Sequence, residues 1–234
     1  MTVSMGELPT QIEYPDEDGK PMAEGDAQGN YMIYAKSALR IYFQNRPNVY
    51  VSGNLFIYYE QGNPEAVVAP DVFVVFRVNN CDRRSYKTWL EEGKTPDFVL
   101  EITSKTTRSK DQGAKKGIYA FLGVREYFQY DSTGDYLNPQ LQGLRLVEGN
   151  YFPIAATTVP DGSFSLSSQV LGLELRLESG ELRFYDPATG QKLNSHEEEA
   201  AARLAAEQAR QEEELRSQRL AAKLRELNID PDTI

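Results

Sequence analysis

The spacing of apolar residues predicts an amphipathic helix early in the chain, followed by several short strands. Over residues 31–43 the apolar positions fit the period of a helix better than the alternation of a strand. Residues 45–48, which include Pro47, predict the end of this helix. Short β-rich runs then alternate with turns containing Gly, Pro, Asn or Asp, and these runs are residues 49–51, 55–59, 66–69, 71–76 and 98–102.

A second helix and a long β-rich region come next. Residues 110–122 have apolar positions compatible with a helix, and Gly123 is well placed to end it. Residues 126–131 predict another strand. Up to about residue 184, short β-like runs alternate with turns, which predicts an extension of antiparallel hairpins. Strands with helices between them indicate the α/β class.

Changes in composition divide the chain into four parts. Residues 1–21 are rich in Pro, Gly, Asp and Glu and predict a loosely ordered arm, whereas residues 22–186 predict an α/β domain with its β-rich extension. Residues 187–194 predict a linker. Residues 195–234 predict a long charged helix, whose pattern fits a solvated helix packed on the domain and equally a homodimerisation arm.

Composition argues against several classes of protein. No run of about 18 apolar residues is present, and the polar, acidic N-terminus has no apolar signal region, so we expect a cytoplasmic protein without a membrane-spanning helix. Cys81 is the only cysteine, and His196, in the charged tail, is the only histidine. Cysteine-based or histidine-rich zinc sites and Ser-His-Asp chemistry are therefore disfavoured.

The net charge is an obstacle to binding nucleic acid, because phosphate groups favour a basic surface. The formal charge is −10. Residues 195–234 contribute −4 of it, from six basic and ten acidic residues, which leaves −6 for the rest of the chain. A divalent cation held by clustered carboxylates would offset part of this charge locally.

Two acidic residues interrupt runs that are otherwise apolar. Asp71 follows Pro70 at the start of one run, and Glu101 lies inside another. An unpaired carboxylate in a buried strand is costly, so such residues are typically kept beside a metal ion or another cation. On neighbouring strands, the two acids would provide the hard oxygen ligands that suit Mg²⁺. Each acid taken alone also fits a carboxylate in a local salt bridge.

The residues around these acids resemble a nuclease family. Pro70-Asp71, followed by Glu101 on the next strong strand, is similar to the PD-(D/E)XK nuclease superfamily. That superfamily has a lysine two residues after the second acid, where this chain has Thr103. The longer pattern resembles the Uma-two family of restriction-endonuclease-like proteins. It covers about residues 67–131 and consists of Glu101-Ile102-Thr103-Ser104, then Asp111, Lys115 and Tyr119, then Gly123-Val124-Arg125-Glu126-Tyr127.

The resemblance implies a fold, a site and an activity. The fold is restriction-endonuclease-like, with a mixed central sheet that has the first helix on one side and the Lys115 helix on the other. The implied metal ligands are Asp71, Glu101 and the backbone carbonyl of Ile102, the metal is Mg²⁺ or Mn²⁺, and Lys115 replaces the strand lysine and orients the attacking water. The implied reaction is metal-dependent hydrolysis of DNA phosphodiester bonds.

Helical geometry favours Lys115 over its neighbour. Asp111, Lys115 and Tyr119 recur every four residues and share one helical face, whereas Lys116 points about 100° away. The same spacing also fits a surface ladder of salt bridges with Tyr119 as a core anchor. Gln129 is expected to be an exposed strand residue rather than part of the edge of the site.

Other polar residues have less specific positions. The superfamily resemblance implies a further glutamate on the first helix, and Glu24 and Asp26, which precede that helix, are candidates for it. Glu60, at the end of a strand, fits the site and equally a surface acid. Basic residues in the loop after Glu101 fit phosphate contacts or solvated side chains, and they are Lys105, Arg108 and Lys110.

Two further functions fit the sequence. The acidic balance and the missing strand lysine favour a catalytically silent nuclease-fold module that assembles through its C-terminal helix. A small-molecule phosphoesterase with the same metal site would tolerate an acidic surface best, because no long polyanion has to dock.

Overall fold

The computed structural model describes residues 12–16, 26–103, 111–159 and 162–226. The chain divides into two units, Met1–Leu193 and Asn194–Ile234. The first unit contains three β-sheets and the helices that cover them, and the second contains one long helix. The candidate residues Asp71, Glu101 and Lys115 all belong to the first unit.

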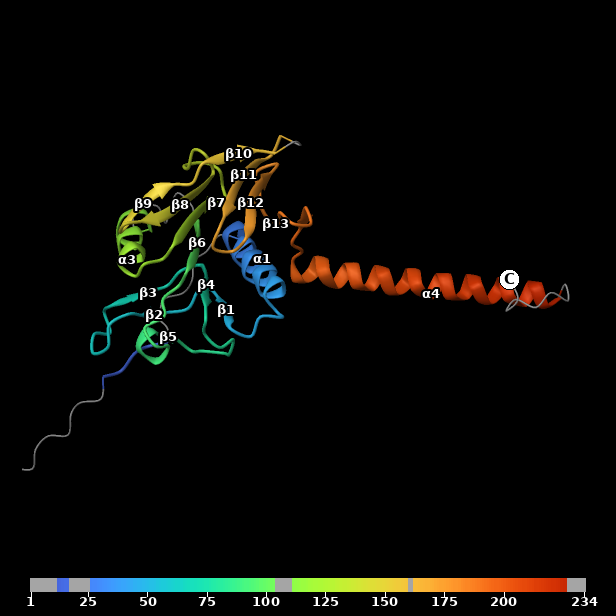
Figure 1. Cartoon of the computed structure of the whole chain (residues 1–234), viewed down its shortest axis with the longest axis horizontal. Helices are drawn as coiled ribbons and strands as arrows, with labels where there is room; N and C mark the ends of the chain where they lie inside the picture. Colours follow the sequence, from blue (N-terminus) through green and yellow to red (C-terminus); the bar gives the residue numbers. More distant parts are fainter. Residues whose placement is uncertain (1–11, 17–25, 104–110, 160–161, 227–234) are drawn as a thin grey trace, which may run out of the picture. The chain divides into compact units, whose positions relative to one another are not determined.

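The central sheet is mixed, as the family resemblance implies. Its strands lie side by side in the order β1-β4-β6-β7-β8-β9, and β6 and β7 are parallel while the other neighbours are antiparallel (Figure 1). The strands are β1 (Val49–Ser52), β4 (Val72–Phe76), β6 (Phe98–Thr103), β7 (Glu126–Asp131), β8 (Leu141–Val147) and β9 (Asn150–Pro153).

Two smaller sheets accompany the central one. A five-stranded antiparallel sheet forms from the predicted hairpin extension, with strands β10 (Ala156–Thr158), β11 (Phe164–Ser168), β12 (Leu173–Glu178), β13 (Glu181–Asp186) and β14 (Gln191–Lys192). A three-stranded sheet, in the order β3-β2-β5, consists of β2 (Ile57–Tyr58), β3 (Val67–Val68) and β5 (Tyr86–Lys87). A short 3₁₀ helix, η1 (Thr88–Leu90), follows β5.

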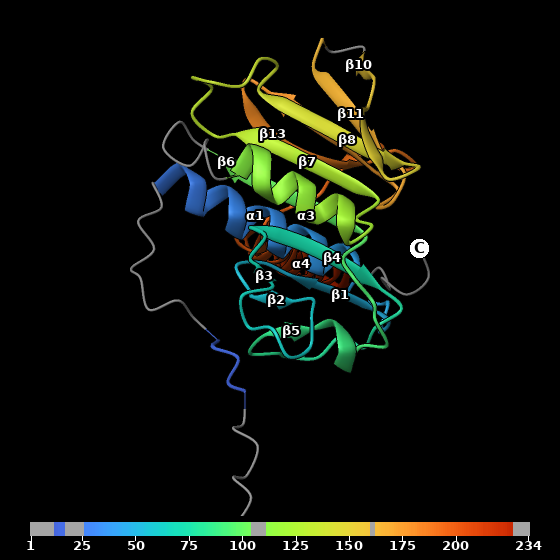
Figure 2. The ribbon, with the colours of Figure 1, turned by 90° about the vertical axis from the view of Figure 1, so that its left-hand side faces the viewer.

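The helices of the first unit cover opposite faces of the central sheet (Figure 2). Helix α1 (Asp26–Tyr42) begins before the predicted start, with Asp26 in its first turn, where a negative charge is favourable. The predicted helix at residues 110–122 is a π-helical turn, η2 (Asp111–Lys115), that continues into α3 (Lys116–Phe121). The positions of both helices relative to the sheet are as predicted.

Two hydrophobic clusters fill the space on either side of the sheet. One joins Leu39 of α1 to Phe98 and Leu100 of β6, and the five-stranded sheet adds Leu173 and Phe184 to it. The other cluster joins Tyr119 of α3 to strand residues of the central sheet and to the three-stranded sheet, and includes Phe73, Val99 and Tyr127. Side chains of a strand alternate between the two faces, so each strand contributes to both clusters.

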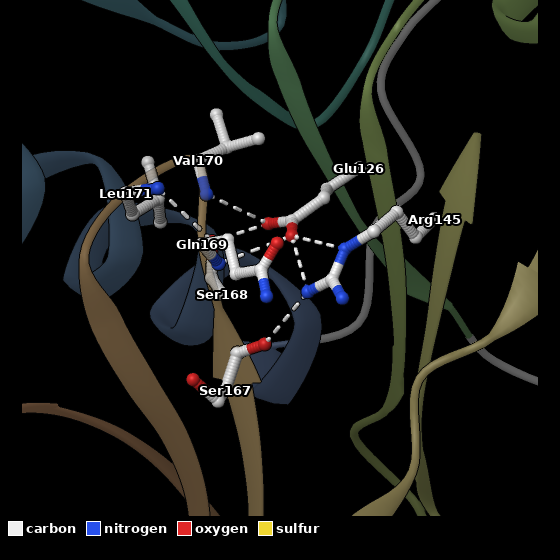
Figure 3. Close-up of polar contacts among 7 residues, drawn as sticks. All are labelled: Glu126, Arg145, Ser167, Ser168, Gln169, Val170 and Leu171. Carbon is white, nitrogen blue, oxygen red and sulfur yellow. Dashed lines mark hydrogen bonds and ion pairs between the residues drawn. The ribbon is translucent and has the colours of Figure 1, made fainter. Parts of the chain in front are cut away.

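A buried carboxylate connects the central sheet to the five-stranded sheet. Glu126, at the start of β7, accepts hydrogen bonds from Arg145 of β8 at 2.9 Å and from the Ser168 hydroxyl at 2.5 Å (Figure 3). The backbone N–H groups of Gln169 and Val170 donate to it at 3.1 and 3.3 Å. A buried charge needs this degree of pairing. Glu126 therefore has a structural role, although it belongs to the family-like pattern of the sequence.

The second unit is a helix with a well-formed start. In α4 (His196–Glu226), the Ser195 hydroxyl accepts from the Glu198 N–H at 3.0 Å, and the Glu198 carboxylate accepts from the Ser195 N–H at 2.8 Å. This reciprocal pair is a capping box, which satisfies two backbone donors at a helix N-terminus. No residue of α4 is buried. Within the described ranges, no helix has the length and apolar character needed to cross a membrane.

Candidate functional site

Strand pairing brings the two candidate carboxylates to one place. Strands β4 and β6 are antiparallel, with Val72 opposite Leu100. One residue further along this register, Asp71 stands opposite Glu101. Strand alternation puts both on the face of the sheet that α3 covers. The expected pair of acids on neighbouring strands is therefore present in the fold.

The position of Asp71 is fixed by backbone contacts on both sides. Its Oδ2 accepts a hydrogen bond of 2.7 Å from the N–H of Ile102 on β6. On the other side, a Cβ atom added to Gly53 would lie 2.1 Å from the carbonyl oxygen of Asp71, so only glycine permits this approach. Next to it, the Asn54 N–H donates to the Pro70 carbonyl at 2.9 Å.

Glu101 is buried and held by two residues of the following helical segment. Its side chain is 1% exposed. Lys115 places its Nζ 3.2 Å from Oε1 and 3.1 Å from Oε2, and the Tyr119 hydroxyl donates to Oε1 at 2.5 Å. Lys115 also donates to the Ala69 carbonyl at 3.2 Å. The shared helical face therefore points at Glu101, and a surface ladder of salt bridges does not describe Lys115.

Burial and crowding of charge perturb the groups at this site. Burial raises the pKa of Asp71 well above its usual value, and the adjacent Glu101 raises it further. Lys115 and the Ile102 N–H oppose this shift. Burial and then Glu101 also raise the pKa of Tyr119, so its hydroxyl stays protonated and acts as a donor. Two carboxylates next to each other, one of them buried enough to have a raised pKa, are a place where a cation is favoured.

Comparison with protein families gives a match over residues 7–178 to Uma2, described as "Putative restriction endonuclease". The chain belongs to the Uma2 family. Uma2 membership confirms the resemblance expected from the sequence, and it identifies the chain as a nuclease-type protein, in a family of hydrolases that act on nucleic acids. The mixed sheet between α1 and α3 is consistent with the restriction-endonuclease-like fold. A comparison with curated proteins gives no match.

The donor set of this Uma2 protein fits a divalent cation. Among the described residues, no group of three or more His, Cys, Asp or Glu side chains gathers around one point. Mg²⁺ is commonly bound by one or two carboxylates, with water and substrate phosphate completing its octahedron. The side chains of Asp71 and Glu101 meet that requirement. The Ile102 carbonyl, implied by the family resemblance as a further ligand, remains a prediction.

The other candidates predicted from the sequence of this Uma2 protein do not join Asp71 and Glu101 in a metal-binding group, or lie outside the described residues. Asp26, at the start of α1, is exposed, and so is Glu60, which accepts from the Asn63 side chain at 3.0 Å. Asp111 begins η2, but its side chain is not among those described. The predictions for four further residues also fall outside the described part of the chain, namely Glu24, Lys105, Arg108 and Lys110.

The structure adds two residues to the Uma2 site that the sequence interpretation did not place there. Tyr119 is a hydrogen-bond donor to Glu101 as well as a core residue, and its four-residue spacing from Lys115 is the signal that indicates this. The prediction that Gln129 is an exposed strand residue is wrong, because Gln129 is only 7% exposed. Its β7 position pairs in register with Glu101. Strand alternation alone does not reveal that α3 covers this face.

Proposed function

We propose that this Uma2 protein is a Mg²⁺-dependent endonuclease that hydrolyses DNA phosphodiester bonds. The observation that supports it most directly is the group formed by Asp71, Glu101 and Lys115. Two carboxylates stand opposite each other on one sheet face, and the Lys115 ammonium lies 3.1 Å from Glu101 Oε2. Family membership supports a nuclease activity on independent grounds.

Each of these residues has a separate task in the proposed reaction. Asp71 and Glu101, together with the Ile102 carbonyl, would hold Mg²⁺ or Mn²⁺. When bound, such an ion polarises a phosphoryl oxygen and lowers the pKa of an attacking water. Lys115 has three N–H donors and a side chain that is 22% exposed. It would orient the water and stabilise negative charge that develops on the phosphate.

The position of Lys115 accounts for the absence of a strand lysine. Thr103, two residues after Glu101, is fully buried, and its hydroxyl is in contact with the Tyr136 hydroxyl. Lys115 reaches the same carboxylate from η2, one strand-to-helix connection later. A cation beside Glu101 is thus supplied from a different element, which keeps the charge pairing that the proposed chemistry needs.

Cleavage of plasmid DNA in Mg²⁺ or Mn²⁺ tests this proposal. Wild type is compared with Asp71→Ala and Lys115→Ala, and Lys116→Ala serves as the matched control because it removes the same charge from the adjacent residue. We expect cleavage that needs metal, that both site variants lose by about a hundredfold or more, and that the control retains. Loss in Asp71→Ala alone would remove Lys115 from the mechanism.

Failure of wild type to cleave is resolved by two further measurements. Calorimetry with Mg²⁺ reports metal binding independently of any DNA sequence requirement. Absence of both cleavage and Mg²⁺ binding would overturn the proposed activity and favour the silent assembly module. Turnover of a small phosphate ester, without affinity for DNA, would favour the phosphoesterase.

We further propose that α4 pairs with α4 of a second copy of this chain. None of its residues is buried, and Leu204 and Leu215 are 62% and 53% exposed. Its two ends differ in charge. Residues 196–214 contain seven acidic and two basic residues, whereas residues 215–226 contain one acidic and four basic residues. An antiparallel pair sets each acidic part against the basic part of the other copy.

A further inference from the structure

Gln129 is a buried polar residue beside the carboxylates. Parallel pairing of β6 and β7 sets Gln129 directly next to Glu101. The neighbouring Tyr127 belongs to the cluster under α3, so alternation puts Gln129 on the same face of the sheet as Glu101. Gln129 is 7% exposed, and its Nε2 has no hydrogen-bond partner among the described residues.

This lack of a partner distinguishes Gln129 from a structural glutamine. Gln140, for comparison, donates from Nε2 to the Asp131 carbonyl at 2.8 Å and to the Gly180 carbonyl at 3.2 Å. Buried amide groups are nearly always hydrogen-bonded, because an unpaired one costs free energy. An apolar side chain at position 129 would avoid this cost. No described residue offsets this cost, and a buried polar group without a partner is characteristic of side chains kept for a ligand.

We propose that Gln129 is a substrate-binding residue whose amide donates a hydrogen bond to a phosphate oxygen of the bound nucleic acid. This inference rests on the proposed nuclease function. Rotation about the last side-chain bond exchanges the amide oxygen and nitrogen, so the donor can turn toward a ligand beside Glu101 without repacking.

A neutral donor suits this position better than a charged one. Lys115 already pairs with Glu101, and a second cation at position 129 would compete further with the use of that carboxylate as a metal ligand. An amide offers an N–H to an anionic oxygen and leaves the carboxylate charge available. Polar side chains such as glutamine commonly contact phosphate oxygens and fix the register of the nucleic acid.

Replacement by leucine separates a ligand-binding role from a structural one. Gln129→Leu and Gln140→Leu make the same change, one at the unpartnered residue and one at the partnered residue. Three quantities are measured for each: the free energy of unfolding in urea without metal or DNA, kcat/KM for plasmid cleavage in Mg²⁺, and the Kd for a fluorescently labelled DNA duplex.

We expect opposite results from the two variants. Gln129→Leu keeps or increases the free energy of unfolding, and its kcat/KM falls by about tenfold or more. Gln140→Leu lowers the free energy of unfolding and keeps kcat/KM within about threefold when measured on folded protein. A lower stability of Gln129→Leu, or unchanged cleavage and duplex binding, would overturn the proposal.

An inactive wild type still gives a decisive result. Duplex that binds wild type and binds Gln129→Leu about tenfold more weakly would support the phosphate contact without turnover. Equal binding would overturn it. If wild type neither cleaves nor binds DNA, the proposed nuclease function is overturned. The ligand proposed for Gln129 is then overturned with it. In that case the stability results for the two leucine variants still decide whether Gln129 has a structural role.

Discussion

The Tyr119 hydroxyl donates a hydrogen bond of 2.5 Å to Oε1 of Glu101, from a ring that has no solvent exposure. Tyr119→Phe removes this donor and keeps the packing of the ring. Because groups that orient a metal ligand contribute to metal affinity, we expect the Mg²⁺ Kd to rise about tenfold or more. Calorimetry and the Mg²⁺ dependence of cleavage both measure it.

Tyr151→Phe is the matched control for this prediction. Its hydroxyl donates to the Val124 carbonyl at 2.7 Å, so the same atom is lost without any contact to a carboxylate. Its Mg²⁺ Kd should equal that of wild type. Equal values for wild type and Tyr119→Phe would show that the Tyr119 hydroxyl does not contribute to Mg²⁺ affinity.

Gly53 is a second point at which a small change should disturb the site. A Cβ at this position would lie 2.1 Å from the Asp71 carbonyl oxygen and 3.3 Å from the Val72 Cα, and both are backbone atoms. Gly53→Ala must therefore move the backbone that presents Asp71. We expect a loss of about 1–3 kcal/mol in stability together with most of the cleavage activity.

Gly29→Ala provides the comparison for Gly53→Ala. Gly29 lies within α1, and a Cβ there meets no atom within 4 Å. Alanine favours a helix over glycine, so thermal unfolding should shift upward by the equivalent of about 0.5–1 kcal/mol. Gly53→Ala with wild-type melting and cleavage would contradict the close packing of Gly53 against Asp71.

Glu126 tests whether every acid in the family-like pattern belongs to the site. Glu126→Gln replaces an acceptor-only group by one that also carries N–H donors, while Arg145 remains beside it at 2.9 Å. Breaking such a buried pair should lower the free energy of unfolding by about 3–5 kcal/mol, measured in urea. Mg²⁺ affinity of the folded fraction should not change, since strand alternation puts Glu126 on the α1 face. Normal stability with lost cleavage would instead assign it to catalysis.

Asp131 gives the fold a stability that depends on pH. Burial alone would raise the pKa of this carboxyl, but N–H donors of Leu137 and Tyr136 and the contacts of Thr133 lower it below its usual value of 3.8. A folded-state pKa below the unfolded one means that the carboxylate stabilises the protein above about pH 4, and that this is lost as pH falls through the folded-state pKa.

Asp131→Asn should therefore lower stability at neutral pH and have less effect in acid. Asparagine has one acceptor oxygen where the carboxylate has two, so we expect a loss of about 1–3 kcal/mol at pH 7. The difference from wild type should shrink below about pH 4. Urea denaturation as a function of pH measures it, and a difference that does not depend on pH would contradict the assignment.

The sequence predicts those features that follow from periodicity and local pattern. Acids within apolar runs indicated Asp71 and Glu101, and four-residue spacing indicated the helical face of Lys115. These signals depend only on residues that are close together in the chain, so they can be recognised in a single sequence. The packing of the five-stranded sheet against α1, through residues such as Phe184, is not local. No periodicity identifies which surfaces will meet.

Gln129 and Gly53 illustrate the same limit at the level of single residues. The sequence pattern predicts that Gln129 is an exposed strand residue. Its face of the sheet is buried because α3, which precedes β7 by a turn, packs across β6 and β7. Gly53 reads as an ordinary turn residue, and its contact with Asp71 requires the loop after β1 to lie against the start of β4. Both features depend on tertiary contacts that a strand pattern does not encode.

Removal of residues 194–234 tests the proposed pairing of α4. Among the described residues, every buried hydrophobic side chain belongs to the first unit, so the shortened chain should fold and keep its thermal stability. We expect light scattering to give a dimer for the whole chain and a monomer for residues 1–193. Exposed unlike charges are screened by salt, so the dimer Kd should rise between about 0.05 and 0.5 M NaCl. A shortened chain that remains dimeric would place the dimer interface on the first unit. A full-length chain that is monomeric would overturn the proposed pairing of α4.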